Sequence, residues 1–267
     1  MIITSLSNPR IKSIRKLADR KFREEQGEYY IEGLRIVGEA FEHHADLVTV
    51  LYSPDLLTSE FGQRLVEQAV SQGIEVLALG GDAFTRLSLK EGPQGIAAVG
   101  RQVFTRLEYL SPVEGEVWIA LDSVQDPGNL GTILRTGDAT GCKGVILLDH
   151  STDPYDPTAL RASMGAVYGL KLVKARLTEF AAWKERQHIL TIGTSDKARV
   201  YYRDFHYRLP MVLLMGSEKM GLTPDHLRLC DEVVSMPMLG TGDSLNLAVA
   251  TGVVLYEIVH QTRMNLE

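Results

Sequence analysis

Cysteine is almost absent from this chain of 267 residues, which contains only Cys142 and Cys230. Neither belongs to a Cys-x-x-Cys pair or to a histidine-rich cluster, so the sequence predicts no structural zinc site. We interpret both as reduced thiols of a cytoplasmic protein. The adjacent His43 and His44 would not share a face of a helix, and we expect surface residues there rather than metal ligands.

Long apolar runs and familiar nucleotide-binding motifs are also missing. No stretch approaches the roughly 18 uninterrupted apolar residues of a membrane helix, and the first residues, MIITSLSNPR, lack the pattern of a signal peptide. The chain contains neither Gly-x-Gly-x-x-Gly nor Gly-Lys-Ser/Thr. We therefore expect a soluble protein that is not secreted, and neither a Rossmann dehydrogenase nor a phosphate-loop enzyme.

Positive charge is scarce overall but is concentrated near the N-terminus. A formal net charge of −6, evenly spread, would argue against a nucleic-acid-binding protein. Near the N-terminus, however, the single acid Asp19 lies among seven basic residues: Arg10, Lys12, Arg15, Lys16, Arg20, Lys21 and Arg23. Contacts to phosphate act within a Debye length of roughly 8–10 Å, so this local cluster matters more than the total charge.

The basic cluster lies on a predicted amphipathic helix. Asn8 can cap this helix and Pro9 suits its first position. Apolar residues follow at helical spacing: Ile11, Ile14, Leu17, Ala18 and Phe22. The basic side chains then occupy the other face, which fits either a solvated surface or a surface that contacts phosphates.

Helix and strand patterns alternate along the rest of the chain and indicate two α/β domains. The first, residues 1–100, has these expected elements: strands at 29–33, 47–52, 74–79 and 95–100, and helices at 34–44, 60–72 and 81–87. The mixed segment 101–115, which contains Pro112 and Gly115, is interpreted as a linker.

The second domain, residues 116–267, is predicted to contain a parallel sheet. Its expected strands are continuously apolar, as in sheets that are covered on both faces: 117–122, 144–148, 188–193, 211–216 and 232–236. Helical stretches separate these strands, and a final apolar helix is expected over 244–260.

Small and polar residues follow three of these strands, in segments 121–136, 212–222 and 234–257. Ligands bind at the carboxyl ends of strands in open α/β sheets, so we expect the three segments to form one composite pocket. Bare Gly216, directly after a strand, would let a ligand approach the backbone.

Taken one at a time, the polar residues of these segments also have structural explanations. Asn129 can cap a helix that carries Arg135 about two turns later. Glu218 suits the start of a helix, and Ser244 can cap the final helix. Asn246 would lie inside that helix, where a polar side chain is costly unless it faces a site.

Taken together, the three segments resemble the motifs of the SpoU (TrmH-like) RNA ribose 2′-O-methyltransferases of the SPOUT superfamily. The matching patterns are, in chain order, Asn129-x-Gly131-x-x-x-Arg135, Gly216-x-Glu218-x-x-Gly221, and Pro237-Met238 followed by Ser244-Leu245-Asn246. Residues 157–169, PTALRASMGAVYG, resemble the family's Arg-x-Ser-x-Gly-Ala stretch. The N-terminal part, with SNPRIKSIRKL, EYYIEGLRIVGEA and PQGIAAV, resembles its substrate-binding domain, which is similar in fold to a ribosomal RNA-binding protein.

The resemblance implies an architecture that periodicity alone does not give. In the family, the catalytic α/β domain contains a deep trefoil knot at its C-terminal end, and two copies form a homodimer that completes the pocket. S-adenosylmethionine is the implied cofactor, held by the main chain at Gly216, Met236 and Leu245 with Thr194 nearby, and no metal is required. The resemblance also turns the basic helix into an expected RNA contact.

The implied reaction is attack by a ribose 2′-hydroxyl on the cofactor's methyl group, in ribosomal RNA. Arg135 matches the family's catalytic arginine. Because a guanidinium stays protonated in proteins, we favour a role in holding the target phosphate and stabilising alkoxide charge, and leave open whether Arg135 takes the proton. Asn129, Glu218, Ser244 and Asn246 match polar residues that shape the pocket.

Two other functions fit parts of the pattern. One is a tRNA 2′-O-methyltransferase of the same fold, and the other is a non-catalytic RNA-binding factor for ribosome assembly. The complete set of motif residues favours an enzyme, and the RNA-binding-like first domain favours ribosomal RNA over tRNA. The target nucleotide stays open, as does the choice between a housekeeping and an antibiotic-resistance role.

Overall fold

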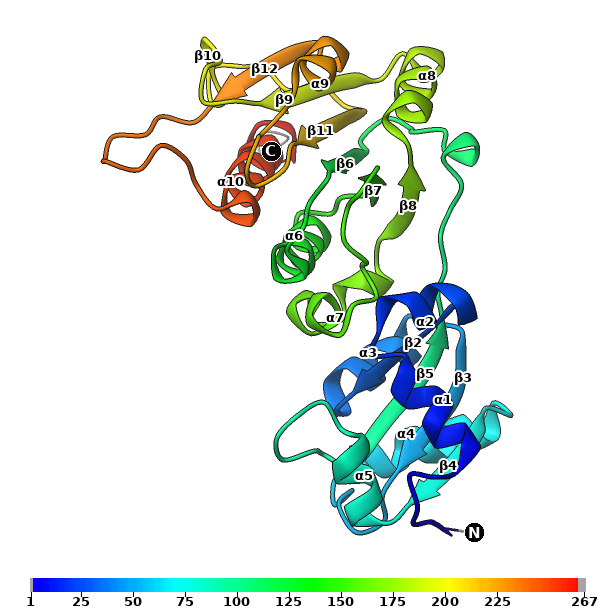
Figure 1. Cartoon of the computed structure of the whole chain (residues 1–267). Coiled ribbons are helices and arrows are strands. Elements are labelled where there is room, and N and C mark those ends of the chain that lie inside the picture. The colour runs from blue at the N-terminus through cyan, green and yellow to red at the C-terminus, as the bar shows by residue number, and fades with distance from the viewer. Residues whose placement is uncertain (1, 264–267) are drawn as a thin grey trace. The chain divides into compact units, whose positions relative to one another are not determined.

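The computed structural model describes residues 2–263, which form two compact units (Figure 1). Unit 1 contains the chain up to Val103 together with Tyr155–Tyr168. Unit 2 contains Phe104–Pro154 and the chain from Gly169 onward. The sequence predicts one uninterrupted C-terminal domain, whereas in the structure a short segment of that half packs in unit 1.

Unit 1 is built on a five-stranded mixed sheet. Its strands lie in the order β1 (Ile2–Ile3), β4 (Glu75–Leu79), β3 (Leu47–Tyr52), β5 (Ile96–Arg101) and β2 (Glu28–Glu32). Strand β5 runs antiparallel to both of its neighbours, and the other pairs are parallel. The helices are α1 (Pro9–Lys16), α2 (Arg20–Gln26), α3 (Leu34–Glu42), α4 (Glu60–Ser71), α5 (Gly81–Leu87) and α7 (Pro157–Ser163), with a 3₁₀ turn at Ala166–Tyr168.

The predicted basic helix is broken into two. Helix α1 ends at Lys16, and α2 begins after Asp19, whose carboxylate accepts the Lys21 N–H at 2.8 Å. A capping aspartate at this position satisfies the free N–H groups of a new helix, so the apolar spacing alone did not predict the break. Ile11, Ile14 and Leu17 nevertheless lie in the core, as the spacing predicts.

Unit 2 is built on a seven-stranded sheet in which every pair is parallel. The order is β10 (Val200–Tyr201), β12 (Glu232–Ser235), β9 (Leu190–Thr194), β11 (Met211–Met215), β6 (Val117–Asp122), β7 (Gly144–Leu148) and β8 (Lys171–Ala175). The helices are α6 (Pro127–Ala139), α8 (Leu177–Gln187), α9 (Pro224–Leu229) and α10 (Leu247–Arg263), with a 3₁₀ turn at Leu107–Tyr109. Helix α10 packs on α6. The predicted α/β class with a mainly parallel sheet is confirmed.

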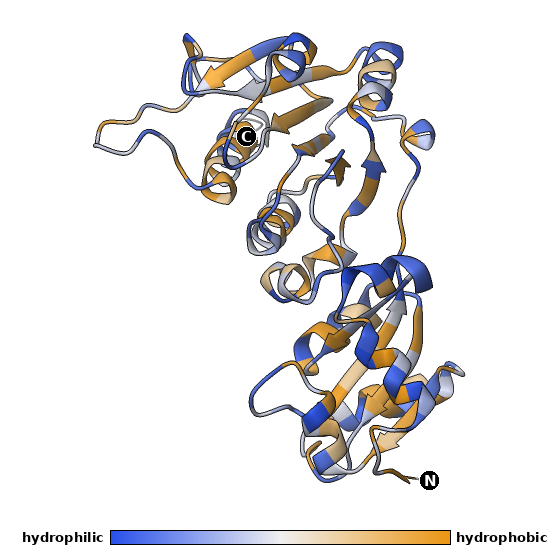
Figure 2. Ribbon diagram, in the orientation of Figure 1, coloured by the Kyte–Doolittle hydropathy of each residue, from blue (hydrophilic) through white to orange (hydrophobic). Residues whose placement is uncertain are grey.

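Hydrophobic residues concentrate on the strands of both sheets (Figure 2). In unit 2, Trp118, Phe180 and Trp183 are fully buried with the strand residues Ile146 and Leu214. The indole N–H of Trp183 donates to the carbonyl of Leu110 at 3.0 Å, so its burial leaves no polar group unpaired. This core fixes the strand ends that carry the candidate site.

Three short strands were not predicted from the sequence, namely β1, β8 and β10, and all three lie at sheet edges. In β8, Lys171 and Lys174 are exposed, and only the central Leu172 and Val173 are buried. Lysine on an edge strand discourages pairing with other chains, but it also removes the apolar run by which a strand is recognised. No helix in residues 2–263 is long and apolar enough to span a membrane.

Candidate active site

Four neighbouring strands of unit 2 end at the same edge of the sheet. They are β12, β9, β11 and β6, and the pairing of Thr194 with Val234 and of Met215 with Leu121 brings their carboxyl ends level. Thr194 is the last residue of β9, and Gly216 and Met236 directly follow β11 and β12. The strand ends that the sequence predicts to lie together therefore share one edge of the sheet.

Two hydrogen bonds join the three motif segments. The side-chain amide of Asn246 donates to Oδ1 of Asn129 at 2.9 Å, and the amide of Asn129 donates to Oε1 of Glu218 at 3.2 Å. These residues are 117 and 89 positions apart in the sequence. The structure therefore brings three of the predicted pocket residues into one connected polar chain.

Glu218 also anchors the loop that follows β6. Its carboxylate accepts the backbone N–H groups of Gln125 at 3.2 Å and of Asp126 at 3.3 Å. Partial burial raises the pKa of Glu218, but hydrogen bonds from its own backbone, from Asn129 and from this loop outweigh burial, so the net pKa is lowered. Glu218 is thus an ionised acceptor that holds two motif segments together.

The helix caps differ from those expected. Asp126, not Asn129, caps α6, because its carboxylate accepts the Asn129 N–H at 2.7 Å. Asn246, not Ser244, lies before the first residue of α10, and its Oδ1 accepts the N–H of Ala248 at 2.9 Å. Both asparagines therefore lie at a helix start and still contribute side-chain groups to the polar chain. An asparagine amide has a carbonyl oxygen that can accept a backbone N–H and an NH₂ group that can donate to a neighbouring side chain.

Arg135 lies on α6, six residues after Asn129, which places it about 9 Å further along the helix axis. Its side chain is exposed, and within residues 2–263 it makes no hydrogen bond or ion pair. The structure does not bring Arg135 into contact with the polar chain. Its guanidinium is instead available to an anionic group from another molecule.

Gly216 is required by the fold of its own loop. A Cβ at this position would lie 2.1 Å from the carbonyl carbon of Gly221 and 2.5 Å from the nitrogen of Leu222. The loop closes on itself through a bond from the Gly221 N–H to the Ser217 carbonyl at 3.0 Å. The packing of this loop therefore already requires glycine at position 216. The reason expected from the sequence, close approach of a ligand to the backbone, is secondary.

The remaining predicted cofactor residues lie around the same edge. The Thr194 hydroxyl donates to Sδ of Met215 at 3.5 Å. The segment from Met236 to Asn246 has no regular secondary structure and extends away from the sheet before α10 (Figure 1). It exposes 97 % of Leu239 and 40 % of Leu245, so the segment carries uncovered apolar surface.

Comparison with known proteins identifies the family. Residues 116–256, more than half of the chain, match the SpoU rRNA Methylase family. The chain belongs to this family. Residues 8–98 match an MRM3-like substrate binding domain. The resemblance inferred from the three motifs and from the N-terminal segments is confirmed.

Several relatives of this SpoU family member match it over nearly its full length. It is 32 % identical to a 23S rRNA (uridine(2479)-2′-O)-methyltransferase of Streptomyces viridochromogenes, over 92 % of this chain and 87 % of that one. A crystal structure of an AdoMet-bound rRNA methyltransferase from Sinorhizobium meliloti is 35 % identical, with a TM-score of 0.90 and 98 % of both chains covered. By contrast, a structure concerned with 2-OH methylation of C/U34 on tRNA covers only 58 % of this chain and 96 % of its own, at 27 % identity and a TM-score of 0.51.

Unit 1 of this family member does not present all seven predicted basic residues at its surface. Arg23 is buried, with 1 % of its side chain exposed, and its guanidinium donates to the carbonyl oxygens of Leu17 and Ala18 at 3.0 and 2.9 Å. It also pairs with Asp156 at 3.1 Å. The assignment of Arg23 to an RNA-contacting face is therefore wrong, because the side chain holds the α1–α2 turn.

Most of the other basic residues have partners at the surface. Arg10 pairs with Glu75 at 3.1 Å, Arg20 with Glu24 at 2.8 Å, and Lys21 with Glu25 at 3.9 Å, while the Lys16 ammonium lies 4.9 Å from the centre of the Phe22 ring. Lys12 and Arg15 are exposed and form no ion pair within residues 2–263. Lys12 and Arg15 are therefore the two exposed basic side chains of α1 that no acidic side chain neutralises within residues 2–263.

One buried pair behind the site had no signal in the sequence. His226, on α9, places Nε2 3.2 Å from Oδ1 of Asp122, the last residue of β6, and both side chains are buried. Nδ1 of the same ring lies 2.6 Å from the Thr223 hydroxyl. The contact places the end of β6 against the helix after the Gly216 loop. Within residues 2–263, no group of three or more His, Cys, Asp or Glu side chains could hold a metal ion.

Proposed function

We propose that this chain transfers a methyl group from S-adenosylmethionine to a ribose 2′-hydroxyl in ribosomal RNA. The observation that carries the proposal is the polar chain of Asn246, Asn129 and Glu218, which joins all three motif segments at the carboxyl edge of a parallel sheet. Ligands of such sheets bind at this edge.

The residues around the edge suit S-adenosylmethionine. This cofactor has no phosphate, so a glycine-rich phosphate loop is not needed. Half-buried Met236 and Leu222 and the exposed Leu245 offer apolar surface for an adenine ring. We assign the main-chain groups of Gly216, Met236 and Leu245 to the cofactor, with Thr194 beside it. When bound, S-adenosylmethionine supplies an electrophilic methyl group.

Within the site, the chain's own residues have separate roles. The exposed guanidinium of Arg135 holds a phosphate of the RNA and stabilises the negative charge that develops on the 2′-oxygen. Glu218 positions the loop after β6 and is a poor general base, because its pKa is lowered and its oxygens already accept N–H groups. Asn129 and Asn246 orient one another, and Ser244 is exposed two residues before Asn246.

Two lines of support favour ribosomal RNA over tRNA. Relatives that match almost the whole chain include a 23S rRNA methyltransferase and an rRNA methyltransferase crystal structure, whereas the tRNA-related structure covers little more than half of this chain. Unit 1 also carries the exposed Lys12 and Arg15, which form no ion pair within residues 2–263. We propose that unit 1 binds ribosomal RNA through these side chains.

We also propose that two copies of the chain associate through α10. This helix exposes 52 % of Val249 and 57 % of Tyr256, which is apolar area that a partner would cover. A homodimer would bring a second α6 and α10 to the site. Sedimentation at micromolar concentration is expected to give twice the monomer mass, and a monomer at that concentration would contradict the assignment.

The direct test uses labelled S-adenosylmethionine and ribosomal RNA from cells that lack the gene. We expect label in the RNA, located by mass mapping to a single 2′-O-methylated nucleotide. Calorimetry should show cofactor binding with no added metal. Absence of both cofactor binding and transfer would refute the enzyme and leave an RNA-binding assembly factor, and transfer to tRNA alone would refute the substrate.

A further inference from the structure

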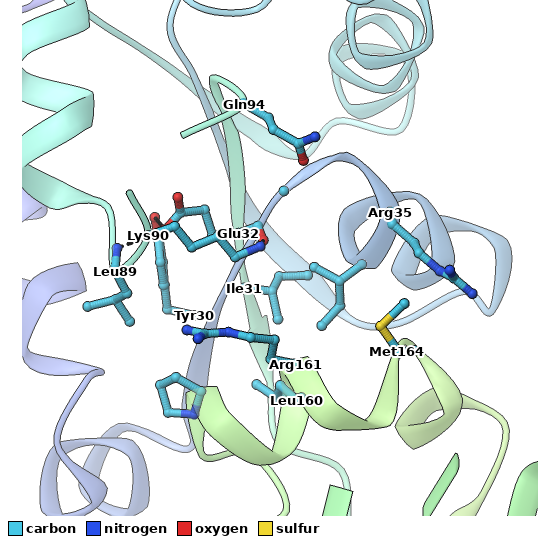
Figure 3. Close-up of a pocket in the computed structure, with 13 residues that line it drawn as sticks. Tyr30, Ile31, Glu32, Arg35, Leu89, Lys90, Gln94, Leu160, Arg161 and Met164 are labelled. Carbon is cyan, nitrogen blue, oxygen red and sulfur yellow. Dashed lines mark hydrogen bonds between the residues drawn. The ribbon is translucent and has the colours of Figure 1, made fainter. Parts of the chain in front are cut away.

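Unit 1 contains a second concave site, separate from the methyl-transfer edge. It is a pocket of about 210 Å³ that opens to solvent between the β2–α3 junction, the segment around Lys90 and helix α7 (Figure 3). None of the residues assigned to methyl transfer lines it.

The walls of the pocket are apolar. Ile31 and Leu160 lie across its centre, Met164 lies toward one side, and Tyr30 toward the other (Figure 3). Tyr30 and Ile31 come from a strand and Leu160 from a helix, so rigid elements fix the shape of these walls. Such a surface suits a flat aromatic ring.

The charges at the pocket are mostly positive. Three basic side chains, Arg35, Lys90 and Arg161, face one carboxylate, Glu32. Glu32 is buried, and its oxygens accept the Leu89 N–H at 2.9 Å and the Ser88 hydroxyl. The carboxylate is therefore committed to the segment that follows α5.

Two of the three cations are free. Lys90 donates to the backbone carbonyl of Glu32 at 2.7 Å. Arg35 and Arg161 are exposed, lie on opposite sides of the pocket in Figure 3, and make no hydrogen bond or ion pair within residues 2–263. In a chain of net charge −6, two unpaired guanidinium groups beside one apolar pocket favour an anionic ligand.

The rim of the pocket is closely fitted. Gly33 has a φ of +112°, and a Cβ there would lie 2.9 Å from Nζ of Lys90 and 3.0 Å from Oε1 of Gln94. That oxygen accepts the Leu34 N–H at 3.0 Å, which leaves the amide nitrogen of Gln94 as a donor at the rim. The pocket therefore combines an aromatic-sized cavity, a polar donor and free positive charge.

We propose that this pocket takes the base of an unpaired RNA nucleotide, while Arg35 and Arg161 hold the adjoining phosphates. The proposal rests on the proposed function, in which RNA is the substrate. An unstacked base recovers its stacking on apolar, aromatic or guanidinium surfaces, and arginine serves such a base and a phosphate equally well. A base held here would anchor the RNA at a second point, in the unit that does not carry the methyl-transfer site.

The test compares two double variants that remove equal charge. In one, Arg35→Gln is combined with Arg161→Gln, and in the matched control Lys12→Gln is combined with Arg15→Gln. The probes are a short single-stranded oligoribonucleotide and an RNA duplex of equal length. We expect the pocket variant to bind the single strand about tenfold or more weakly and the duplex nearly as well as the wild type. The control should weaken binding to both probes alike.

Two further measurements separate stacking from charge and from folding. Arg161→Lys keeps the charge but loses the planar group, so we expect an unchanged salt slope and weaker single-strand binding. Photocrosslinking of wild-type protein to 4-thiouridine-substituted RNA should modify peptides that contain residues 30–36 or 157–164. Thermal unfolding should be unchanged in the variants, because neither arginine has a partner in residues 2–263.

The outcomes distinguish this pocket from the proposed function. If the wild type methylates ribosomal RNA but the pocket variant keeps its preference for the single strand, the pocket proposal is overturned alone. Crosslinks found only outside the pocket would overturn it as well. If crosslinks form in the pocket but no methyl transfer occurs, the pocket is supported and the proposed enzyme is refuted.

Discussion

At the residue scale, the site separates side chains that organise it from the one that is left free. Glu218, Asn129 and Asn246 are committed to one another and to the loop after β6. Arg135 has no such partner in residues 2–263 and is available to RNA. Burial raises the pKa of the Cys230 thiol, which packs against the core of this sheet, to about 12, so it stays protonated. We therefore expect mutations of the three connected residues to alter the structure of the site, and mutation of Arg135 to alter the reaction.

Arg135→Ala should lower kcat/KM for RNA methylation by about 100-fold or more, because a donor to developing negative charge is lost. Cofactor affinity and thermal stability should hardly change, since the side chain has no partner in the described chain. Arg135→Lys should also be slow. Arg186→Ala, which removes an exposed arginine from α8, is the matched control. Near-normal turnover of Arg135→Ala would contradict the role given to it.

Glu218→Gln should change how stability depends on pH. The pKa of Glu218 in the folded chain lies below its ordinary value of 4.5, so its contribution is complete above that pH and is lost as the pH falls through the lowered pKa. The wild-type Tm should therefore fall more steeply than that of Glu218→Gln as the pH drops below 4.5. Parallel curves would show that the charge of Glu218 does not support the loop.

At the element scale, the sequence predicted the buried elements better than their ends. The strands expected at 47–52, 117–122 and 144–148 agree with β3, β6 and β7 at every residue, because long apolar runs between turn residues leave few alternatives. The predicted N-cap residues of α6 and α10 were wrong. Several neighbouring polar residues can cap a helix, and tertiary contacts decide which of them does. The edge strands carry too few apolar residues to be recognised.

Asn246→Ala should destabilise α10 by about 1 kcal/mol through loss of the cap, and should also remove the bond to Asn129. Methyl transfer should fall with it. Ser244→Ala is the matched control, because Ser244 does not cap the helix and its side chain is exposed. Chemical denaturation of both variants measures the difference. Equal losses of stability would restore Ser244 as the cap.

The α1–α2 segment should respond differently at its surface and in its interior. Lys12→Gln with Arg15→Gln should lower the slope of log affinity for RNA against log salt by about 0.7–0.9 per lost contact, with the fold unchanged. Arg23→Gln should instead destabilise unit 1 by about 1.5–3 kcal/mol, because it removes charged hydrogen bonds to Leu17, Ala18 and Asp156. Salt titration and unfolding curves separate the two effects, and an unchanged slope would make the face of α1 a solvated surface.

At the scale of the whole molecule, the motifs predicted the family and the α/β class, which are confirmed. The polar chain could not have been derived from spacing, because it joins residues about one hundred positions apart through the sheet order. The trefoil knot and the homodimer stay predictions of the resemblance. The sequence also did not predict that Tyr155–Tyr168 packs in unit 1. Its helical pattern indicates a buried face but not the core against which that face packs.

That return predicts how the molecule responds to cleavage. A protease site inserted in 111–115 and then cut should leave the two fragments associated, because the Tyr155 ring stacks on Tyr29 at 4.6 Å and Asp156 pairs with Arg23. Size-exclusion chromatography without denaturant should show a single species containing both fragments. Separation into two folded pieces would show that the first 103 residues are complete by themselves.

The same segment also sets an order of events during synthesis. When Val103 has left the ribosome, unit 1 still lacks α7, and the face of Tyr29 that Tyr155 covers is open to solvent. Translation must pass through the first strands of the other sheet, Phe104–Pro154, before the missing helix is made. At roughly 5–20 residues per second, the N-terminal unit waits several seconds, unfinished, for a helix that is encoded in the other half of the gene.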